Sequence, residues 1–219
     1  MKLFIYCAGG FGKEVMDVAR RINNIENRWD EICFIDDMLE CDDFYGAKLF
    51  NLATVLDKFD IMSIAISIAN GEPANKKALY DRVVHAGAKL ATLVDHTATV
   101  SSSAQLGAGV IVSAYCFISS SAVIGDNTIL NTNALVGHDV ILADNCVISS
   151  AVNIGGNCSI GESSYIGMGS QIKQGITIGK DAIIGMGSVV YKDIPSGVIA
   201  LGNPARPMKA NQDKKVFKN

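Results

Sequence analysis

The pair His138-Asp139 contains the residue types best suited to chemistry in this 219-residue sequence. A histidine can accept a proton near neutral pH, and an adjacent carboxylate can orient its ring and favour the charged form that a general base must adopt. The sequence has two other histidines. His85 lies late in a predicted helix and is expected at the surface, and His96 lies at a predicted domain junction, where a structural role is favoured. His138 is therefore the candidate general base.

His138 lies within a six-residue repeat that predicts a left-handed parallel β-helix from about Val94 to Val190. A strict period of six predicts one short strand and one turn per unit, and three units close one triangular coil. Stacked coils lie about 4.8 Å apart, so equivalent aliphatic side chains form continuous ladders. An amphipathic helix would recur at three and four residues instead. The aliphatic positions are Val94, Val100, Leu106, Val112, Ile118, Ile124, Leu130, Val136, Leu142, Ile148, Ile154, Ile160, Ile166, Ile172, Ile178, Ile184 and Val190.

The repeat does not itself require a histidine at position 138. His138 is the third residue of the hexad 136–141, near a corner of the predicted prism, so its side chain is expected to face outward. Pro195 and Pro204 break the repeat near its end, and the polar tail, residues 208–219, is expected to be an arm or disordered. The outward-facing histidine is therefore a candidate for function rather than for packing.

Composition and cysteine spacing narrow the class of protein. The net charge of -3 gives no electrostatic support for a nucleic-acid or anionic-membrane partner. The sequence contains neither a run of about 20 apolar residues nor a signal-peptide pattern, so a cytoplasmic protein is expected. Cys116, Cys146 and Cys158 share one position of the repeat that otherwise holds small residues. They are predicted to be buried thiols in a reducing compartment.

Residues 1–90 predict a small parallel sheet of Rossmann type, followed by the β-helix domain, residues 91–207. Strands and helices alternate along this N-terminal part, which is typical of a parallel α/β sheet. The predicted strands are Leu3–Cys7, Ile32–Ile35, Asp60–Ser67 and Lys89–Leu93, and a helix is predicted over Pro73–Ala86. The fold class is therefore mixed: an α/β module followed by a β-helix.

Two segments of this module could bind a nucleotide. The turn Ala8–Gly12 would expose backbone N–H groups and a helix N-terminus to a phosphate, although Cys7 occupies the first glycine position of the dinucleotide motif. Asp36-Asp37 follows the second strand, where acidic residues often bond ribose or base groups. A merely tight turn and a solvated acidic turn stay open as alternatives. The small sheet favours a mononucleotide.

The sequence resembles the bacterial nucleotide-aminosugar N-acetyltransferases and sialic-acid O-acetyltransferases (NeuD/PglD-like), a family of hexapeptide-repeat acyltransferases. The similarity begins at Cys7–Gly12, continues through Phe34–Asp37 and Asn131–Asp139, and ends at Gly202–Arg206. The last segment is similar to the closing Gly-x-Pro-Ala-basic motif of the family. Many members have a histidine where Phe11 and Val147 stand here, but catalysis by His138 depends on neither.

The resemblance implies a homotrimer with acetyl-coenzyme A (acetyl-CoA) between neighbouring prisms and a nucleotide sugar against the N-terminal module; no metal is expected. His138 would accept the proton of the sugar amine, Asp139 would hold the imidazole, and Asn131 would place the acceptor. A backbone N–H of the Gly155-Gly156 turn would face the developing oxyanion. Coenzyme-binding residues would be Gly156, Gly167, Gly187, Gly202 and Arg206; substrate-binding residues would be Gly9, Gly10, Phe11, Gly12, Asp36, Asp37 and Asn70.

The leading hypothesis is an acetyl-CoA-dependent N-acetyltransferase acting on a nucleotide-linked 4-amino-dideoxy sugar, for surface polysaccharide or glycan synthesis. An O-acetyltransferase of the same family is the main alternative. A zinc hydrolase on the same β-helix would need three converging histidines, and the repeat proper contains only His138. A non-catalytic nucleotide-sugar-binding scaffold is less favoured because His138-Asp139 and the Gly202–Arg206 ending would have no role in it.

Overall fold

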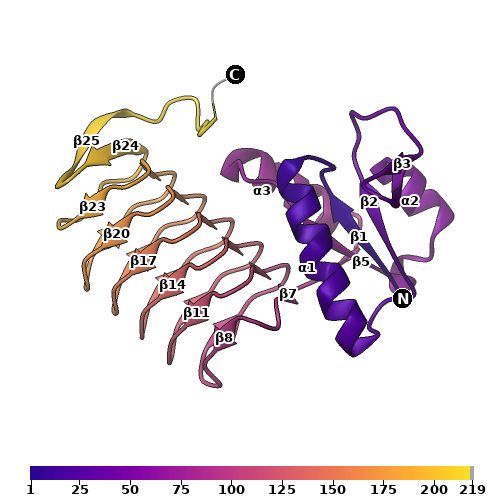
Figure 1. The fold of residues 1–219 in the computed structure, drawn as a ribbon. Coiled ribbons are helices and arrows are strands. Elements are labelled where there is room, and N and C mark those ends of the chain that lie inside the picture. Colours follow the sequence, from indigo (N-terminus) through magenta and orange to yellow (C-terminus); the bar gives the residue numbers. More distant parts are fainter. Residues whose placement is uncertain (218–219) are drawn as a thin grey trace.

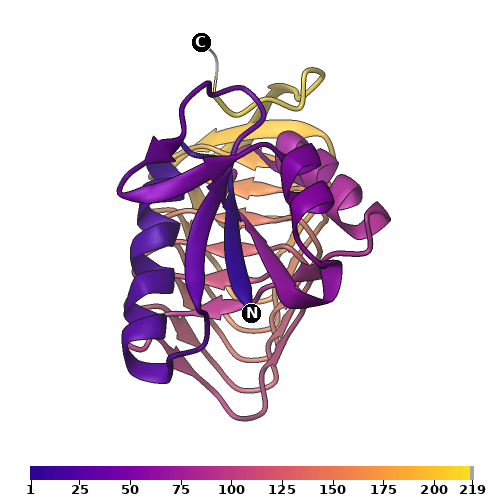
Figure 2. The same ribbon diagram turned by 90° about the vertical axis from the view of Figure 1, so that its right-hand side faces the viewer.

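A computed structural model describes residues 1–217, and it contains an α/β module and a triangular β-helix packed against each other (Figure 1). In the view turned by 90°, the sheet of the α/β module lies in front of the prism (Figure 2). Residues 218 and 219 of the predicted tail lie outside the described residues. Among the described residues, the structure contains no helix that is both long enough and apolar enough to cross a membrane.

The α/β module confirms the predicted Rossmann-like alternation. Its sheet has the order β3-β4-β2-β1-β5-β6, parallel throughout except for the β3–β4 edge. Helix α1 covers one face of the sheet, and α2 and α3 pack with the residues of the other face. The elements are β1 (Lys2–Tyr6), α1 (Gly10–Glu26), β2 (Glu31–Ile35), β3 (Asp43–Phe44), β4 (Ala47–Phe50), α2 (Leu52–Lys58), β5 (Ile64–Ile68), α3 (Pro73–His85) and β6 (Lys89–Leu90).

Two predicted strands differ from the structure. Residues Ile61–Ser63 form a 3₁₀ turn, capped by the Asp60 carboxylate, which accepts the Met62 N–H, so β5 begins only at Ile64. The predicted strand Lys89–Leu93 is divided between β6, in the α/β sheet, and β7, in the β-helix. The first difference comes from the Asp60 cap, which favours a turn. The second arises because the chain passes from one sheet to another between β6 and β7. β-propensity carries information on neither.

The β-helix confirms the hexapeptide prediction: the second residue of every strand from β7 to β23 is one of the predicted aliphatic positions. Parallel pairing joins strands three units apart and creates three faces. Face A contains β7 (Leu93–Val94), β10 (Ile111–Val112), β13 (Ile129–Leu130), β16 (Val147–Ile148), β19 (Tyr165–Ile166) and β22 (Ile183–Ile184). Face B contains β8 (Thr99–Val100), β11 (Phe117–Ile118), β14 (Leu135–Val136), β17 (Asn153–Ile154), β20 (Gln171–Ile172) and β23 (Val189–Val190). Face C contains β9 (Gln105–Leu106), β12 (Val123–Ile124), β15 (Ile141–Leu142), β18 (Ser159–Ile160) and β21 (Thr177–Ile178).

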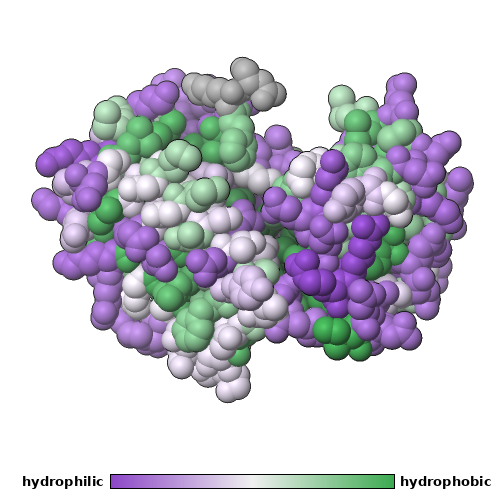
Figure 3. Space-filling view, in the orientation of Figure 1, coloured by the Kyte–Doolittle hydropathy of each residue, from purple (hydrophilic) through white to green (hydrophobic). Residues whose placement is uncertain are grey.

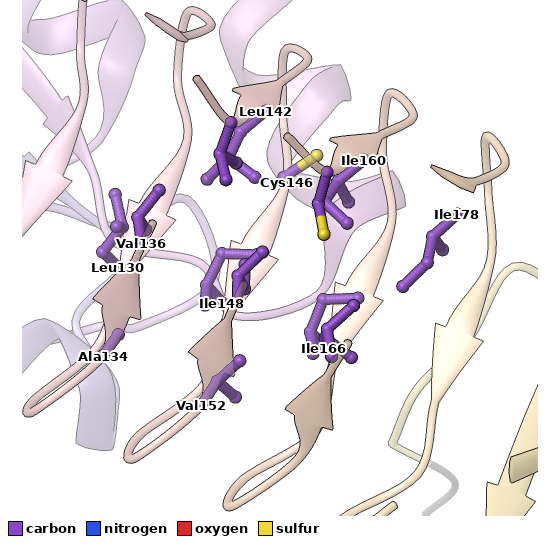
Figure 4. Packing of buried hydrophobic residues seen from close by; sticks show 14 of the residues in the cluster. Leu130, Ala134, Val136, Leu142, Cys146, Ile148, Val152, Ile160, Ile166 and Ile178 are labelled. Atoms are coloured by element: carbon purple, nitrogen blue, oxygen red, sulfur yellow. The ribbon is translucent and has the colours of Figure 1, made fainter. Parts of the chain in front are cut away.

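The ladders fill the interior of the prism. Leu130, Ile148 and Ile166 stack above one another from successive coils, and Leu142, Ile160 and Ile178 do the same from face C (Figure 4). The three repeat cysteines are buried as predicted, and each thiol donates to a backbone carbonyl fifteen residues further along the chain. Because each buried methylene is worth about 0.8 kcal/mol, this continuous packing holds the corners in fixed positions.

The outward side of face A joins the two modules. Leu93, Ile111, Ile129 and Val147 form a row that is buried in one cluster with residues of α1 and the α/β sheet. Val147, one of the two positions at which the resemblance led us to expect a histidine, is therefore part of the interdomain core. Past the repeat, β24 (Val198–Gly202) continues face A and pairs with β25 (Ala205–Ala210), so the start of the predicted tail at residue 208 lies within a strand.

Candidate active site

His138 lies on the corner between faces B and C, which we call corner BC (residues 137–140 in this coil). Its side chain is 52% exposed, and Nδ1 lies 2.8 Å from Oδ2 of Asp139. Asp139 takes the left-handed backbone conformation, with φ of 56°, as do the equivalent corner residues Ser121 and Asn157. The turn geometry of the repeat thus places the carboxylate beside the ring, and the Asp139 contact leaves Nε2 available to a substrate.

Gly156 lies directly against the His138 ring, one coil further along the prism. A Cβ atom at position 156 would lie 2.5 Å from Nε2 and 2.6 Å from Cε1 of His138. Only a glycine leaves room for the imidazole there, because real Cβ contacts are longer than this. Within residues 1–217, the Gly156 N–H has no hydrogen-bond partner, so it is available as the oxyanion donor that the sequence predicted.

The remaining predicted residues of the β-helix lie on a different corner of the same prism. Asn131, Gly167 and Gly187 all follow strands of face A, at the corner between faces A and B, here called corner AB. Within the described chain, no hydrogen bond joins Asn131 to His138 or Asp139, and the buried Oδ1 of Asn131 has no partner. Within one chain, Gly156 therefore lies beside His138, whereas Asn131, Gly167 and Gly187 lie on another corner.

A second predicted group lies at the end of the prism. Gly202 closes the β24–β25 hairpin with φ of 103°, and Arg206 stands on β25. Arg206 lines a pocket of about 470 Å³ with Tyr191, Lys192 and residues of the hairpin. Its guanidinium group makes no hydrogen bond or ion pair with the rest of residues 1–217, so it is free to bind a phosphate, the bidentate partner that arginine favours.

The α/β module contains a pocket of about 570 Å³ at the carboxyl ends of β1, β2 and β5. Of the residues predicted to bind substrate, it brings together Gly9, Asp36, Asp37 and Asn70. Such a position, beside the first strand–helix turn, is where parallel α/β sheets bind their ligands. A wider hollow of about 780 Å³ lies on the other side of the acidic pair, but it includes neither the glycine turn nor Asn70.

Asp36 and Asp37 both hold the walls of this pocket. Asp36 accepts the Ala8 N–H through Oδ2 and the Met38 N–H through Oδ1, which fixes the glycine turn against the end of β2. Asp37 accepts the Leu52 N–H through Oδ1. Their carboxylates are thus hydrogen-bonded within the chain, and any nucleoside contact uses the remaining lone pairs.

Tyr6 and Arg82 were not predicted from the sequence, yet both line the pocket through Asp37. Asp37 Oδ2 accepts the Tyr6 hydroxyl at 2.5 Å and an Arg82 N–H at 2.8 Å. Burial alone would raise the pKa of Asp37, but hydrogen bonds from Leu52, Tyr6 and Arg82 outweigh it, so the pKa lies below its usual value. Burial, followed by the bond to Asp37, raises the pKa of Tyr6. The network therefore keeps an anionic carboxylate, a neutral phenol and a guanidinium at neutral pH.

The glycine turn differs from the dinucleotide motif at its first position, where Cys7 stands in place of glycine. Cys7 adopts φ of 86°, a conformation that favours glycine, and its thiol accepts an N–H from Asn70. Burial raises the pKa of this thiol to about 11. A Cβ at Gly12 would lie 2.1 Å from the Cys7 carbonyl oxygen, so Gly12 permits the close approach of α1 to β1. Gly10 and Phe11 open α1 outside the pocket, and Phe11 packs against the interdomain core.

The remaining histidines are accounted for. His85 is exposed at the end of α3, as predicted, and the His96 ring lies 3.8 Å from the Glu26 carboxylate of α1. In the part of the chain that the structure describes, no three His, Cys, Asp or Glu side chains are grouped so that they could hold a metal ion.

Several solved structures are similar to nearly the whole of this chain. The PglD N-terminal domain family matches residues 2–83, and the bacterial transferase hexapeptide family matches residues 157–192. The acetyltransferase domain of PglB from Neisseria gonorrhoeae FA1090, in complex with acetyl coenzyme A, is 33% identical, with 94% of this chain and 98% of that chain covered and a TM-score of 0.89. Comparison with curated proteins gave no match.

Two further structures are similar at lower identity. PerB from Caulobacter crescentus, in complex with CoA and GDP-perosamine, is 29% identical over 95% of this chain and 98% of its own, with a TM-score of 0.87. WeeI from Acinetobacter baumannii AYE is 28% identical over 95% of this chain and 100% of its own, with a TM-score of 0.88.

The fold and the exposed His138-Asp139 pair define a hexapeptide-repeat acyltransferase with an N-terminal Rossmann-like module. The identity of 33% with the PglB acetyltransferase domain, over 94% of this chain, narrows this class further. The chain belongs to the PglD-like sugar acetyltransferases.

Proposed function

We propose that this protein transfers an acetyl group from acetyl-CoA to the amino group of a nucleotide-linked 4-amino-dideoxy sugar, with His138 as the general base. The observation that carries the proposal is the His138-Asp139 pair, half exposed at a corner of the β-helix, with Gly156 against its ring. Similar proteins support the class of substrate, since PerB is described with CoA and GDP-perosamine and the PglB domain with acetyl coenzyme A.

In this mechanism, His138 accepts a proton through Nε2 while the sugar amine attacks the carbonyl carbon of the thioester. Asp139 holds Nδ1 and stabilises the imidazolium that forms. The Gly156 N–H donates to the oxygen that gains charge. As the carbon–sulfur bond breaks, the proton on Nε2 passes to the departing thiolate, so the imidazole is neutral again and the products are an amide and a free thiol.

The two modules have different roles in this proposal. The pocket lined by Gly9, Asp36, Asp37 and Asn70 binds the nucleotide, with Arg82 available for a base or phosphate oxygen, and residues 91–207 carry the transferase chemistry. Gly10, Phe11 and Gly12 act by forming the start of α1 beside the phosphate. At the other end, Arg206 binds a coenzyme phosphate near Gly202. Both substrates are cytoplasmic metabolites, so we place the protein in the cytoplasm.

We further propose a homotrimer, because one chain separates the two groups of predicted residues. Corner BC carries His138 and Gly156, whereas corner AB carries Asn131, Gly167 and Gly187. A ring of three prisms, with corner BC of each facing corner AB of the next, would complete the site between copies. The surface supports this, since exposed apolar residues lie on face B (Phe117 and Leu135) and on face C (Val123 and Ile141). Figure 3 shows apolar patches over face B.

The decisive experiment offers UDP-, dTDP- and GDP-linked 4-amino-4,6-dideoxyhexoses, together with sialic acid, to the protein with acetyl-CoA. We expect acetylation at nitrogen of one nucleotide sugar, detected by mass spectrometry as a product that resists mild alkali. Acetylation at oxygen of sialic acid would replace the proposal with the O-acetyltransferase alternative. Binding of a nucleotide sugar without any acetylation would favour the scaffold alternative. Sedimentation analysis tests the trimer, and a monomer that is active would refute it.

A further inference from the structure

The C-terminal tail segment, residues 211–217, is docked against the molecule rather than free. It leaves β25 and runs back over the prism towards α3 (Figure 1). Asn211 is 9% exposed; its backbone N–H donates to the Gly197 carbonyl and its Nδ2 to the Asp181 carbonyl, at 2.8 and 2.9 Å. Lys214 Nζ lies 2.9 Å from the Asp181 carboxylate. These contacts direct the chain towards the N-terminal module.

The end of the segment binds the loop that precedes α3. Two successive backbone N–H groups donate to one carboxylate: Val216 to Glu72 Oε1 at 2.7 Å and Phe217 to Glu72 Oε2 at 3.2 Å. The Phe217 ring meets the Tyr165 ring edge to face, with centroids 5.8 Å apart. A Cβ on Gly71 would lie 3.8 Å from the Phe217 ring. The hydrogen bonds to a charged acceptor are the strong part of this contact, since Phe217 itself is 57% exposed.

The position of Tyr165 explains why a segment is needed there. Tyr165 pairs with Val147 and is the next rung on the outward side of face A. The α/β module buries the row up to Val147 and leaves Tyr165 only partly covered. The tail segment therefore covers Tyr165, which lies just beyond the part of face A that the α/β module buries. There it contacts both modules, Tyr165 in the β-helix and Glu72 in the α/β module.

A chain of hydrogen bonds leads from the tail segment to the pocket. The Glu72 N–H donates to Asn70 Oδ1 at 2.9 Å, and Asn70 Nδ2 donates to Cys7 Sγ at 3.4 Å. Asn70 and Cys7 both line the pocket of about 570 Å³, and α3, which begins directly after Glu72, supplies Arg82 to the same pocket. The Glu72 carboxylate makes no bond that caps α3; its acceptors are used by the tail segment.

We propose that the tail segment is a positioning element: it fixes residues 70–72 and the start of α3 in the geometry that binds the nucleotide part of the substrate. This inference rests on the proposed function for its kinetic consequence, but the contact itself does not. Loss of the contact lets the loop move and weakens nucleotide binding, whereas His138 and the coenzyme-binding end of the prism are unaffected.

The test compares Val216→Pro, which removes one donor from the tail alone, with Glu72→Gln, which removes one acceptor oxygen from the loop alone. Lys215→Ala, at an exposed neighbouring residue whose side chain forms no hydrogen bond or ion pair within residues 1–217, is the control. Each of the first two variants is expected to raise KM for the nucleotide sugar about 5-fold. The KM of the double variant should equal that of either single variant, rather than show the product of the two effects, since both substitutions disrupt the same contact between the tail segment and Glu72. The value of kcat and KM for acetyl-CoA should stay within about two-fold.

Hydrogen exchange separates the contact from the proposed function. Amides of residues 70–76 should exchange faster in both variants than in the wild type and in Lys215→Ala. Unchanged exchange would overturn the positioning role even if the enzyme acetylates a sugar. If the wild type acetylates nothing, the proposed function fails, and titration with UDP, dTDP and GDP decides the inference. Weaker binding of the diphosphate in both variants supports it, and equal binding refutes it. A multiplicative double variant also refutes it.

Discussion

The β-helix and the α/β module organise their functional side chains in different ways. In the β-helix, each coil repeats the backbone of the coil below, so a side chain such as His138 needs only its own hexad, Asp139, and Gly156 one coil away. In the α/β module, the pocket depends on Asp37 at the end of β2 accepting from Tyr6 on β1 and Arg82 on α3. The first site is local and periodic, and the second is assembled from distant segments.

This difference has a consequence for how each region tolerates change. The ladders hold the corner of the prism by packing, so a substitution on the outer corner alters chemistry and leaves the fold intact. In the pocket, a substitution removes one member of a hydrogen-bond network and affects its other members. Substitutions in the two regions should therefore separate into losses of rate and losses of binding.

The largest effect is expected from His138→Ala. Removing the base should lower kcat by about 100-fold to 10,000-fold, the range for general acid–base catalysis, without changing the melting temperature. Steady-state acetylation measured by thiol release checks this, with His96→Ala as the control at full rate. Near-normal turnover in His138→Ala would remove the general base from the mechanism.

The next largest effect is expected from Gly156→Ala, in comparison with Gly87→Ala in the α/β module. The new Cβ at 156 meets the imidazole at 2.5 Å, so the ring must move and kcat should fall about 10-fold to 100-fold at nearly unchanged stability. Gly87 has φ of 76° with no atom within 4 Å, so its substitution should cost about 1 kcal/mol of stability and leave the rate unchanged. Equal rates in both variants would show that ring position is not critical.

A smaller effect, on binding, is expected from Arg82→Ala. Loss of the guanidinium leaves Asp37 without one of its partners and removes a donor from the pocket. We expect KM for the nucleotide sugar to rise about 10-fold, with kcat within about three-fold, since a charged hydrogen bond is worth about 1.5–3 kcal/mol. Titration with the nucleoside diphosphate provides the same comparison without turnover. A loss confined to kcat would place Arg82 at the reacting centre instead.

The smallest effect concerns stability at the junction of the modules. Lys76 on α3 is fully buried, and its Nζ has no hydrogen-bond partner among the described residues. Burial lowers its pKa well below the usual value, an effect only partly opposed by Cys146, whose own pKa is raised to about 12. The unfolded chain therefore binds a proton that the folded chain does not, and stability falls as the pH decreases from about 10 towards neutrality.

Replacing this side chain by Met should remove that penalty. The Lys76→Met variant is expected to be about 1–3 kcal/mol more stable at pH 7, because it buries a similar volume without an unpaired polar group. The gain should shrink as the pH approaches 10, where the unfolded lysine is also neutral. Urea unfolding at pH 7 and pH 9.5 measures both values; a gain independent of pH would show that the penalty does not come from the proton that the buried amine gives up.

The fold could be predicted to different depths in the two regions. The six-residue period determined every strand from β7 to β23, because each ladder position faces the same core in every coil. In the α/β module, α2, β3 and β4 were missed, since short edge elements have weak patterns. Tyr6 and Arg82 could not be predicted as neighbours of Asp37, because their contacts join residues that are far apart along the chain.

The sequence by itself determined the repeat, the buried cysteines and the outward position of His138, because a strict period fixes which side of each strand meets the core. Only the tertiary structure decided that Asp37 holds Tyr6 and Arg82 together and that Phe217 reaches Tyr165 and Glu72. These arrangements depend on how two modules and a tail pack against one another, and local spacing carries no record of contacts between segments that far apart.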